Sequence, residues 1–293
     1  MRRMPGQGEA LVIWTIWGAM TLAVLVTYSR IDPAELYNTS HDGLTGGLSR
    51  SVTLLSFPIA LVAIALVLVA VAALSRAAWW VAAPAIALCA TVPWAVDQGD
   101  LDARWVNAFP ALGVLLAGGL TAAAARRVGP SFATRRTGDP ARVIAAVVVV
   151  LLSLPWAAAE LGFHFPGDLF MGEELSHESD GRVIAAVHLG HHHGTDGALL
   201  VLTALLLSRV RVGQRRLRIG VLGYLGAMLA YGGVNFVQDL WLEQVVKRGW
   251  TDASIPSALL PGPRPIWLAI VLLAALATLA LLQETESASY SEA

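Results

Sequence analysis

Long runs of apolar residues dominate the chain, and its polar residues gather in short segments between them. Two of the runs, SFPIALVAIALVLVAVAAL (56–74) and IWLAIVLLAALATLALL (266–282), contain no ionisable residue. A helix needs roughly 17–25 such residues to cross the hydrocarbon core of a bilayer, which is ~30 Å thick. The pattern therefore predicts an all-α, polytopic integral membrane protein.

Apolar segments of this kind recur along the chain and predict a bundle of about eight transmembrane helices. The first is expected to stay uncleaved, because no small-residue cleavage site follows it. We expect one transmembrane domain over residues 1–283 and a disordered polar tail over 284–293. The expected spans are 10–28, 51–74, 77–97, 107–125, 142–161, 184–208, 218–239 and 264–283.

The distribution of basic residues predicts the orientation of these spans. Arg2 and Arg3 precede the first span, and the run SRVRVGQRRLR (208–218) lies between the sixth and seventh. The segments on the opposite side, which hold Arg50 and Arg104, carry fewer basic residues and more acids. By the positive-inside rule, both termini face the cytoplasm in a plasma or bacterial-type inner membrane.

Composition and charge narrow the range of partners. Charged residues make up 14% of the chain and its formal net charge is −1, against about 25% charged residues in a soluble domain. The basic segments are short, so we expect the lipid bilayer as a partner and no nucleic acid. The single cysteine, Cys89, excludes an intramolecular disulfide.

The stretch HLGHHHG (188–194) holds four of the seven histidines. If it is helical, His188 and His192 are one turn apart, and His191 shares their face within an arc of about 100°. His193 then points elsewhere. Histidines at a membrane boundary are also ordinary wetted polar residues, and the glycines of this stretch permit an irregular backbone, so this alternative stays open.

Carboxylates lie at the same predicted outer boundary. Asp97, Glu160 and Asp239 each close a span there. Asp196 precedes Arg209 by 13 residues, which puts it about 20 Å from the inner boundary and inside the outer leaflet. A carboxylate at that depth is costly unless it is paired, protonated or bound to a metal, so Asp196 is a candidate functional residue.

Imidazoles and carboxylates together are the ligands of zinc, copper and iron, so the sequence predicts a metal site at the extracytoplasmic face. Glu160 and Asp196 are the candidate general bases. Polar residues at the outer ends of neighbouring spans are expected to orient the ligands, namely Asp97, Asp239 and Asn235. The candidate ligands are His188, His192, His191 and, one turn after Glu160, His164.

Three classes of function fit this pattern. The first is a metal-dependent membrane enzyme acting on a lipid-like or small extracytoplasmic substrate. The second is a metal or proton transporter, and the third a non-catalytic assembly or lipid-binding protein. The inner halves of the predicted spans contain no ionisable residue, which favours a one-sided site over a conduit for ions, because such conduits are lined with polar groups.

Overall fold

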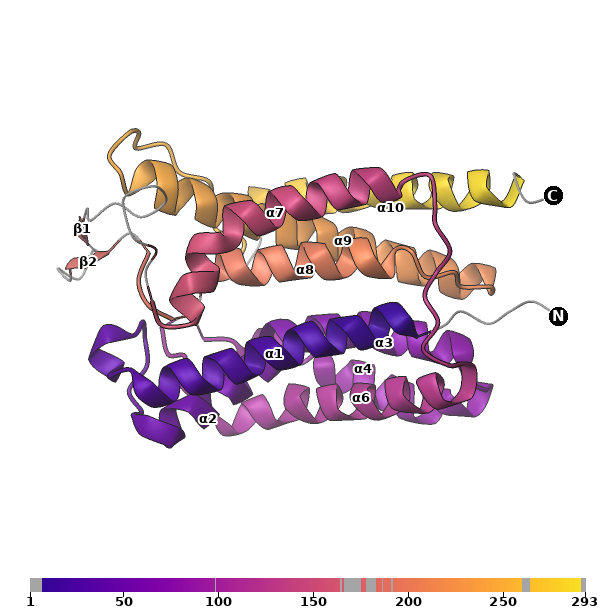
Figure 1. Ribbon diagram of the computed structural model, residues 1–293, viewed down its shortest axis with the longest axis horizontal. Helices are drawn as coiled ribbons and strands as arrows, with labels where there is room; N and C mark the ends of the chain where they lie inside the picture. Colours follow the sequence, from indigo (N-terminus) through magenta and orange to yellow (C-terminus); the bar gives the residue numbers. More distant parts are fainter. Residues whose placement is uncertain are drawn as a thin grey trace.

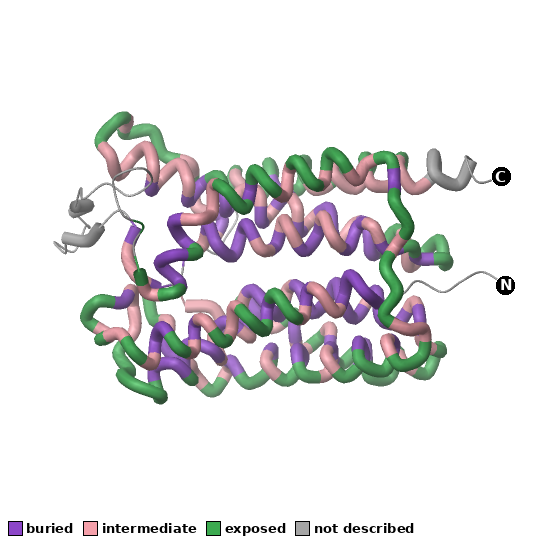
Figure 2. The backbone as a smooth tube through the Cα atoms, viewed as in Figure 1, coloured by how far each residue is buried: buried purple, intermediate pink, exposed green. Residues whose placement is uncertain are grey.

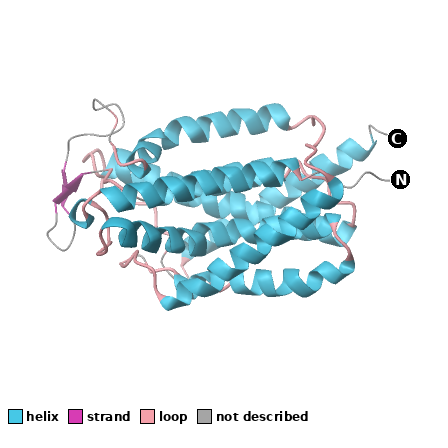
Figure 3. Cartoon of the chain, turned by 60° about the horizontal axis from the view of Figure 1, so that its bottom comes forward, coloured by secondary structure: helices cyan, strands magenta, loops and turns pink. Residues whose placement is uncertain are grey.

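The computed structural model describes residues 7–97, 99–163, 165, 175–177, 183–185, 187–190, 192–259 and 264–290. Within them the chain forms a bundle of helices that run roughly along one axis, as Figures 1 and 3 show. Seven helical segments of this part are long and apolar enough to cross a membrane, which supports the predicted multi-pass helical architecture.

Most of the long helices coincide with predicted apolar segments. The principal helices are α1 (Gly8–Arg30), α2 (Gly43–Leu54), α3 (Ala60–Ala73), α4 (Trp79–Cys89), α5 (Val92–Ala95), α6 (Ala108–Val128), α7 (Asp139–Glu160), α8 (His193–Leu207), α9 (Arg215–Trp241) and α10 (Pro265–Tyr290). Shorter helical turns are η1 (Pro33–Glu35), η2 (Leu55–Ile59), η3 (Arg76–Ala78), η4 (Trp105–Asn107) and η5 (Leu242–Val246). The short strands β1 (Leu175–His177) and β2 (Val183–Ala185) pair antiparallel.

The bundle consists of two halves that lie as two layers in Figure 1, α1 to α6 in one and α7 to α10 in the other. We call the end that carries residues 31–42 and 96–104 the outer end, following the charge rule, and the opposite one the inner end. Figure 2 shows that buried residues follow the inward helix faces and exposed residues the outside.

Hydrogen bonds between helix interiors join the two halves. Trp17 Nε1 in α1 donates to Thr203 Oγ1 in α8 over 3.1 Å. Tyr224 Oη in α9 donates to the carbonyl of Leu61 in α3 over 2.8 Å. A large aromatic side chain buries most of its surface while its polar tip finds a partner, so each contact fixes the register of one layer on the other.

Apolar side chains cover the outside of the bundle. The helix α10 exposes Leu268, Leu272 and Leu276, each more than half accessible. Patches of this extent are rare on soluble monomers, whereas lipid tails cover them without cost. The exposed faces are therefore compatible with contact to a bilayer.

Ion pairs tie the helices together at the inner end. Arg142 in α7 forms two hydrogen bonds with Glu284 in α10, at 2.8 and 2.6 Å. Arg209, which follows α8, lies 3.2 Å from Asp139 and 3.7 Å from Glu9 of α1. The pair with Glu9 joins the two halves. The helix α10 ends at Tyr290. The division into one domain over 1–283 and a polar tail over 284–293 stays a prediction.

The expected sixth span, 184–208, is wrong at its beginning. The helix α8 starts at His193 and has 15 residues, about 22 Å of helix. Gly190 before it has φ +99°, a left-handed conformation that a continuous right-handed helix excludes. The irregular backbone permitted by the glycines is therefore what forms.

Two further spans are interrupted where prolines fall. The expected second span, 51–74, begins earlier at Gly43 and breaks at Phe57, whose φ of −166° and ψ of 128° are extended. The expected third span, 77–97, breaks after Cys89 and resumes as the short α5 with Pro93 in its first turn. Proline lacks the N–H that a helix interior requires, so a regular helix ends or kinks at such positions.

Candidate functional site

The first turn of α8 begins deep in the outer part of the bundle and is anchored by α9. The N–H of Gly194 donates to the Asp239 carboxylate over 2.7 Å. Gly194 also packs on the face of Trp156 in α7, so closely that a Cβ there would overlap the ring. One turn later Gly197 meets the α9 backbone, where a Cβ would lie 2.6 Å from the nitrogen of Phe236. Because both residues are glycine, the beginning of α8 packs closely against α7 and α9.

Aromatic and imidazole rings form a stack beside this turn. His188 stacks on Tyr37 with ring centroids 4.5 Å apart, and on His192 with centroids 4.2 Å apart. His192 in turn stacks on Trp156 at 6.5 Å. The predicted pairing of His188 and His192 on one helix face is wrong, because His188 precedes α8 and His192 is its N-cap in extended conformation. The rings nevertheless meet.

Hydrogen bonds fix the protonation of one imidazole nitrogen in each ring. His192 Nε2 lies 2.8 Å from the carbonyl oxygen of His188, and His188 Nδ1 lies 3.2 Å from that of Leu189. A carbonyl only accepts, so both of these nitrogens carry hydrogen. In the neutral rings the lone pairs are therefore on Nδ1 of His192 and Nε2 of His188.

Glu160 lies at the outer end of α7 and is 1% exposed. Its backbone carbonyl accepts a hydrogen bond from Thr27 Oγ1 of α1, and the neighbouring carbonyl of Ala159 accepts the N–H of Gly190 over 3.1 Å. These contacts hold the end of α7 against α1 and against the segment before α8. The helix ends at Glu160, and His164 and His191 lie outside the described residues.

No three histidine, cysteine or acidic side chains of the described part lie close enough together to hold a metal ion. Asp239, expected to orient a ligand, accepts the N–H of Gly194 at the start of α8, and its role toward a ligand stays a prediction. Asn235 is buried one turn earlier and donates to the carbonyl of Tyr231 over 3.0 Å.

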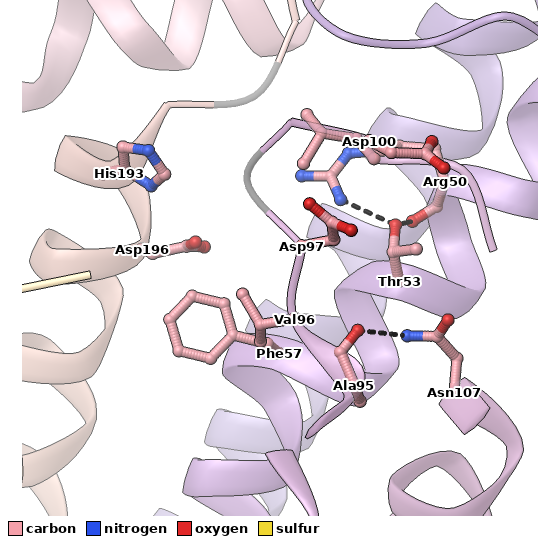
Figure 4. Close-up of a pocket in the computed structure, with 11 residues that line it drawn as sticks. Arg50, Thr53, Phe57, Ala95, Val96, Asp97, Asp100, Asn107, His193 and Asp196 are labelled. Carbon is pink, nitrogen blue, oxygen red and sulfur yellow. Dashed lines mark hydrogen bonds between the residues drawn. The ribbon is translucent and has the colours of Figure 1, made fainter. Parts of the chain in front are cut away.

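A small pocket opens at the outer end between the two halves. Figure 4 shows His193 and Asp196 on one side of it and Arg50, Asp97 and Phe57 on the other. The lining is completed by Thr53, Ala95, Val96, Asp100, Leu101 and Asn107. The structure thus brings two of the predicted site residues, Asp196 and Asp97, to one pocket, together with His193, which helical geometry had set aside.

The acids of the pocket differ in their surroundings. Asp196 belongs to the first turn of α8 and is 3% exposed. Asp97 is half exposed and pairs with Arg104 over 3.1 Å. Asp100 at the mouth is exposed.

Arg50 is the residue that the sequence analysis missed. The charge count placed it in an outer loop, whereas it lies in α2 and is 3% exposed. Its Nη1 donates to Thr53 Oγ1 over 2.6 Å, and its guanidinium carbon lies 5.8 Å from the centre of the Tyr28 ring. The available signal was an outer-side arginine directly before an apolar run, which the positive-inside rule disfavours.

A second polar cluster lies beside the mouth and joins the two outer loops of the first half. Asp102 accepts hydrogen bonds from Ser40 and Ser49, and His41 Nδ1 lies 2.9 Å from it. The hydrogen bond and charge of Asp102 raise the pKa of His41 above its usual value. Burial favours a higher pKa for Asp102, but its hydrogen bonds to Ser40 and His41 outweigh that and lower it.

Comparison with known proteins gives no match, since no family model, curated protein or solved structure is similar to this chain.

Proposed function

We propose that this chain is a multi-pass protein of the plasma or inner membrane that binds a small polar solute from the extracytoplasmic side, in the manner of a solute carrier. The observation that carries the proposal is the position of the pocket, which lies between the two halves and is lined by residues of both. Carriers that alternate between two access states hold their substrate at such an interface between two moving bodies.

The helices around the pocket are interrupted at the points where they line it. Arg50 and Phe57 come from the broken α2–α3 span, Val96 follows the short α5, and Asp196 lies in the first turn of α8. Non-helical backbone at membrane depth occurs where it is buried in protein or lines a cavity, and broken helices of this kind form substrate sites in carriers.

An ion pair joins the two halves at the inner end of the bundle, opposite the pocket. The pair between Arg209 and Glu9 joins the halves there, and Glu9 Oε1 also accepts the N–H of Ala133 over 2.8 Å. Glu9 is 1% exposed. An ion pair across two bodies stabilises one arrangement of them and is exchanged for other contacts when they move.

Cysteine accessibility tests this arrangement, because Cys89 is the only native cysteine and is buried. In a Cys89→Ala background, Val96→Cys places a thiol in the pocket, and a membrane-impermeant maleimide is applied to intact cells and to inside-out vesicles. We expect labelling from outside only. Arg127→Cys at the inner end is the matched control and should react only from inside. Absence of outside labelling at Val96→Cys would show that the pocket is not an outer-face site.

The carrier mechanism itself is tested by loosening the inner end. Adding Arg209→Gln should reduce outside labelling of Val96→Cys, because the ion pair at the inner end no longer stabilises the outward-facing arrangement. Thr203→Cys, which contacts Trp17 between the halves, should then become reactive from inside. Equal labelling rates with and without Arg209→Gln would instead indicate a fixed site.

A metal-dependent membrane enzyme is the second candidate, favoured by the stack of His188 on His192 beside the end of α7. Imidazole nitrogens are ordinary ligands of zinc, copper and iron. His164 and His191 would complete the ligand set, and Glu160 or Asp196 would act as general base toward a lipid-like or small extracytoplasmic substrate.

Elemental analysis separates this candidate from the carrier. Untagged protein is purified in mild detergent, as wild type and as His188→Ala/His192→Ala. Near-stoichiometric metal that is lost in the double variant would support the enzyme and its site. Wild type without metal, which also fails to bind added zinc, would exclude a metal centre and leave the carrier proposal unaffected.

A further inference from the structure

We propose that the pocket between the halves binds a small zwitterion, a molecule that carries both an oxyanion and an ammonium group. The oxyanion contacts Arg50, and the ammonium group faces the acidic side chains Asp97, Asp100 and Asp196. This inference depends on the proposed function in one respect, that the pocket is a ligand site open to the outer side.

The first argument is the state of the Arg50 guanidinium. It is 3% exposed, and among the described residues it forms no ion pair with a carboxylate. Only Nη1 has a hydrogen-bond acceptor in that part of the chain, and Nε is buried without one. An arginine keeps its charge at any physiological pH, and a buried charge without an anionic partner is strongly unfavourable. An anionic ligand supplies the missing partner.

The second argument is the geometry of the guanidinium edge. Thr53 occupies Nη1, which leaves the edge formed by Nε and Nη2. Two parallel N–H groups on one edge match the two oxygens of a carboxylate or a phosphate, and such paired contacts are stronger than single neutral ones. Arg50 lines the pocket, and Figure 4 shows its guanidinium on the side opposite His193 and Asp196.

The third argument is the excess of acids around this arginine. Three carboxylates line the pocket together with one guanidinium and the imidazole of His193. Asp97 pairs with Arg104 outside the lining, and Asp100 is exposed at the mouth. A purely anionic ligand would be repelled by the acids, and a purely cationic one would leave Arg50 without a partner. A molecule that carries both charges satisfies both sides of the pocket.

The size of the pocket restricts the ligand further. The pocket is small and partly open at its mouth, so it encloses only the charged end of a ligand. It suits an amino-acid-like solute or the headgroup of a zwitterionic phospholipid. Both sources present the same chemistry to Arg50 and to the acids, and an experiment with two arms distinguishes them.

The experiment measures how far added compounds protect Val96→Cys, in the Cys89→Ala background, from the maleimide. Glycine and O-phosphoethanolamine are the soluble zwitterions, and acetate and methylamine carry one charge each. We expect at least one zwitterion to slow labelling at concentrations where acetate and methylamine have no effect. In the lipid arm, nanodiscs of phosphatidylglycerol are compared with nanodiscs that also contain phosphatidylethanolamine. Slower labelling in the second kind alone would identify the lipid as the source.

The outcomes separate this inference from the proposed function. If Val96→Cys never reacts, the pocket is not open and the proposed function fails. If it reacts but neither the soluble zwitterions nor phosphatidylethanolamine protects it, the pocket is open and does not bind a zwitterion. The same conclusion follows if acetate or methylamine protects equally well. These comparisons use one folded protein throughout, so they do not depend on the stability of a variant.

Variants then assign the contacts. Arg50→Gln should raise the zwitterion concentration needed for half-maximal protection about tenfold or more, because a charged hydrogen-bonded contact is lost. Arg50→Lys keeps the charge and loses the paired edge, so its effect should be intermediate. Arg30→Gln removes an exposed outer-end arginine outside the pocket and should have no effect. An unchanged half-maximal concentration in folded Arg50→Gln would overturn the role of Arg50.

Discussion

The backbone N–H of Gly194 donates to the Asp239 carboxylate over 2.7 Å, so a side chain of α9 caps the beginning of α8. Asp239 is 4% exposed and lies within a membrane-spanning segment. The first N–H groups of a helix have no partner inside it and carry partial positive charge, which favours a carboxylate beside them. The contact gives this buried acid a structural role besides the one that the sequence predicted for it at a metal site.

Removing this cap should weaken the fold in a graded way. Asp239→Ala should lower the free energy of unfolding by about 1–3 kcal/mol, because the N–H of Gly194 stays buried without its acceptor. Asp239→Asn keeps an oxygen acceptor and should cost less. The measurement is the thermal midpoint of the detergent-solubilised protein, with exposed Asp252→Asn as the control. Equal midpoints for Asp239→Ala and Asp252→Asn would show that the cap does not stabilise α8.

The glycines of α8 should be intolerant of a side chain. In Gly197→Ala the new Cβ would lie 2.6 Å from backbone atoms of Gly232 and Phe236, which forces α8 and α9 apart at a cost of about 1–3 kcal/mol. Gly194→Ala would meet the Trp156 ring instead. A smaller residue at 156 should therefore rescue the stability of Gly194→Ala and leave Gly197→Ala unrescued.

Gly233 in α9 provides the matched control for both variants. A Cβ at Gly233 meets no atom within 4 Å, and alanine favours a helix over glycine by roughly 0.5–1 kcal/mol. Gly233→Ala should thus unfold at the same or a higher temperature. A similar loss of stability in all three alanine variants would show that close packing is not what selects glycine in α8.

The helices of the bundle could be predicted because each one depends on the apolar residues of its own segment. Apolar runs without ionisable residues have few alternatives to a membrane helix, and seven of the expected spans correspond to segments long enough to cross. The start of α8 was not predictable in this way. It depends on Gly190 adopting φ +99° and on a carboxylate 45 residues away, at Asp239, and neither follows from periodicity.

In the candidate site, too, some features follow from the local sequence and others depend on contacts between distant segments. The 13-residue distance from Asp196 to Arg209 predicted a position in the outer leaflet, and the structure buries Asp196 inside the protein, at 3% exposure. The partnership of Asp196 with Arg50 and Asp97 in one pocket depends on how the two halves pack, which no property of a single segment contains. Arg50 was assigned to a loop because α2 extends eight residues beyond the apolar run that revealed it.

The ion pair between His41 and Asp102 should make the stability of the fold depend on pH. The raised pKa of His41 means that its contribution is complete below the ordinary value of 6.5 and is lost as pH rises through the folded value. The lowered pKa of Asp102 means that its contribution is present above 3.8 and is lost as pH falls through the folded value. The ion pair therefore stabilises the fold most between about pH 3.8 and pH 6.5.

The comparison of wild type with His41→Gln tests this dependence. The thermal midpoint of the wild type should exceed that of the variant at pH 5.5, and the difference should disappear by pH 9, where His41 is neutral in either state. Asp102→Asn should behave like His41→Gln at pH 5.5. A difference of the same size at both pH values would mean that His41 acts through packing and not through its charge.

The pair between Arg142 and Glu284 should hold the inner end of α10 to α7. The two side chains are 10% and 23% exposed and share two hydrogen bonds, so their coupling should be about 1–2 kcal/mol, above that of a solvent-exposed pair. Glu284→Gln should speed amide hydrogen exchange in the last turns of α10. It should leave the rest of the helix unaffected, because those residues pack on α9 independently of this pair.

A double-mutant cycle with Arg142→Gln isolates the pair from the other contacts of Arg142. Arg142 Nε also donates to Ser208 Oγ over 2.9 Å, so Arg142→Gln alone should cost more than Glu284→Gln. The two together should cost less than the single effects combined, by the coupling energy. Exposed Arg127→Gln serves as the control. Additive effects would show that the ion pair contributes nothing, and that α10 is held at the inner end by its apolar contacts with α9 alone.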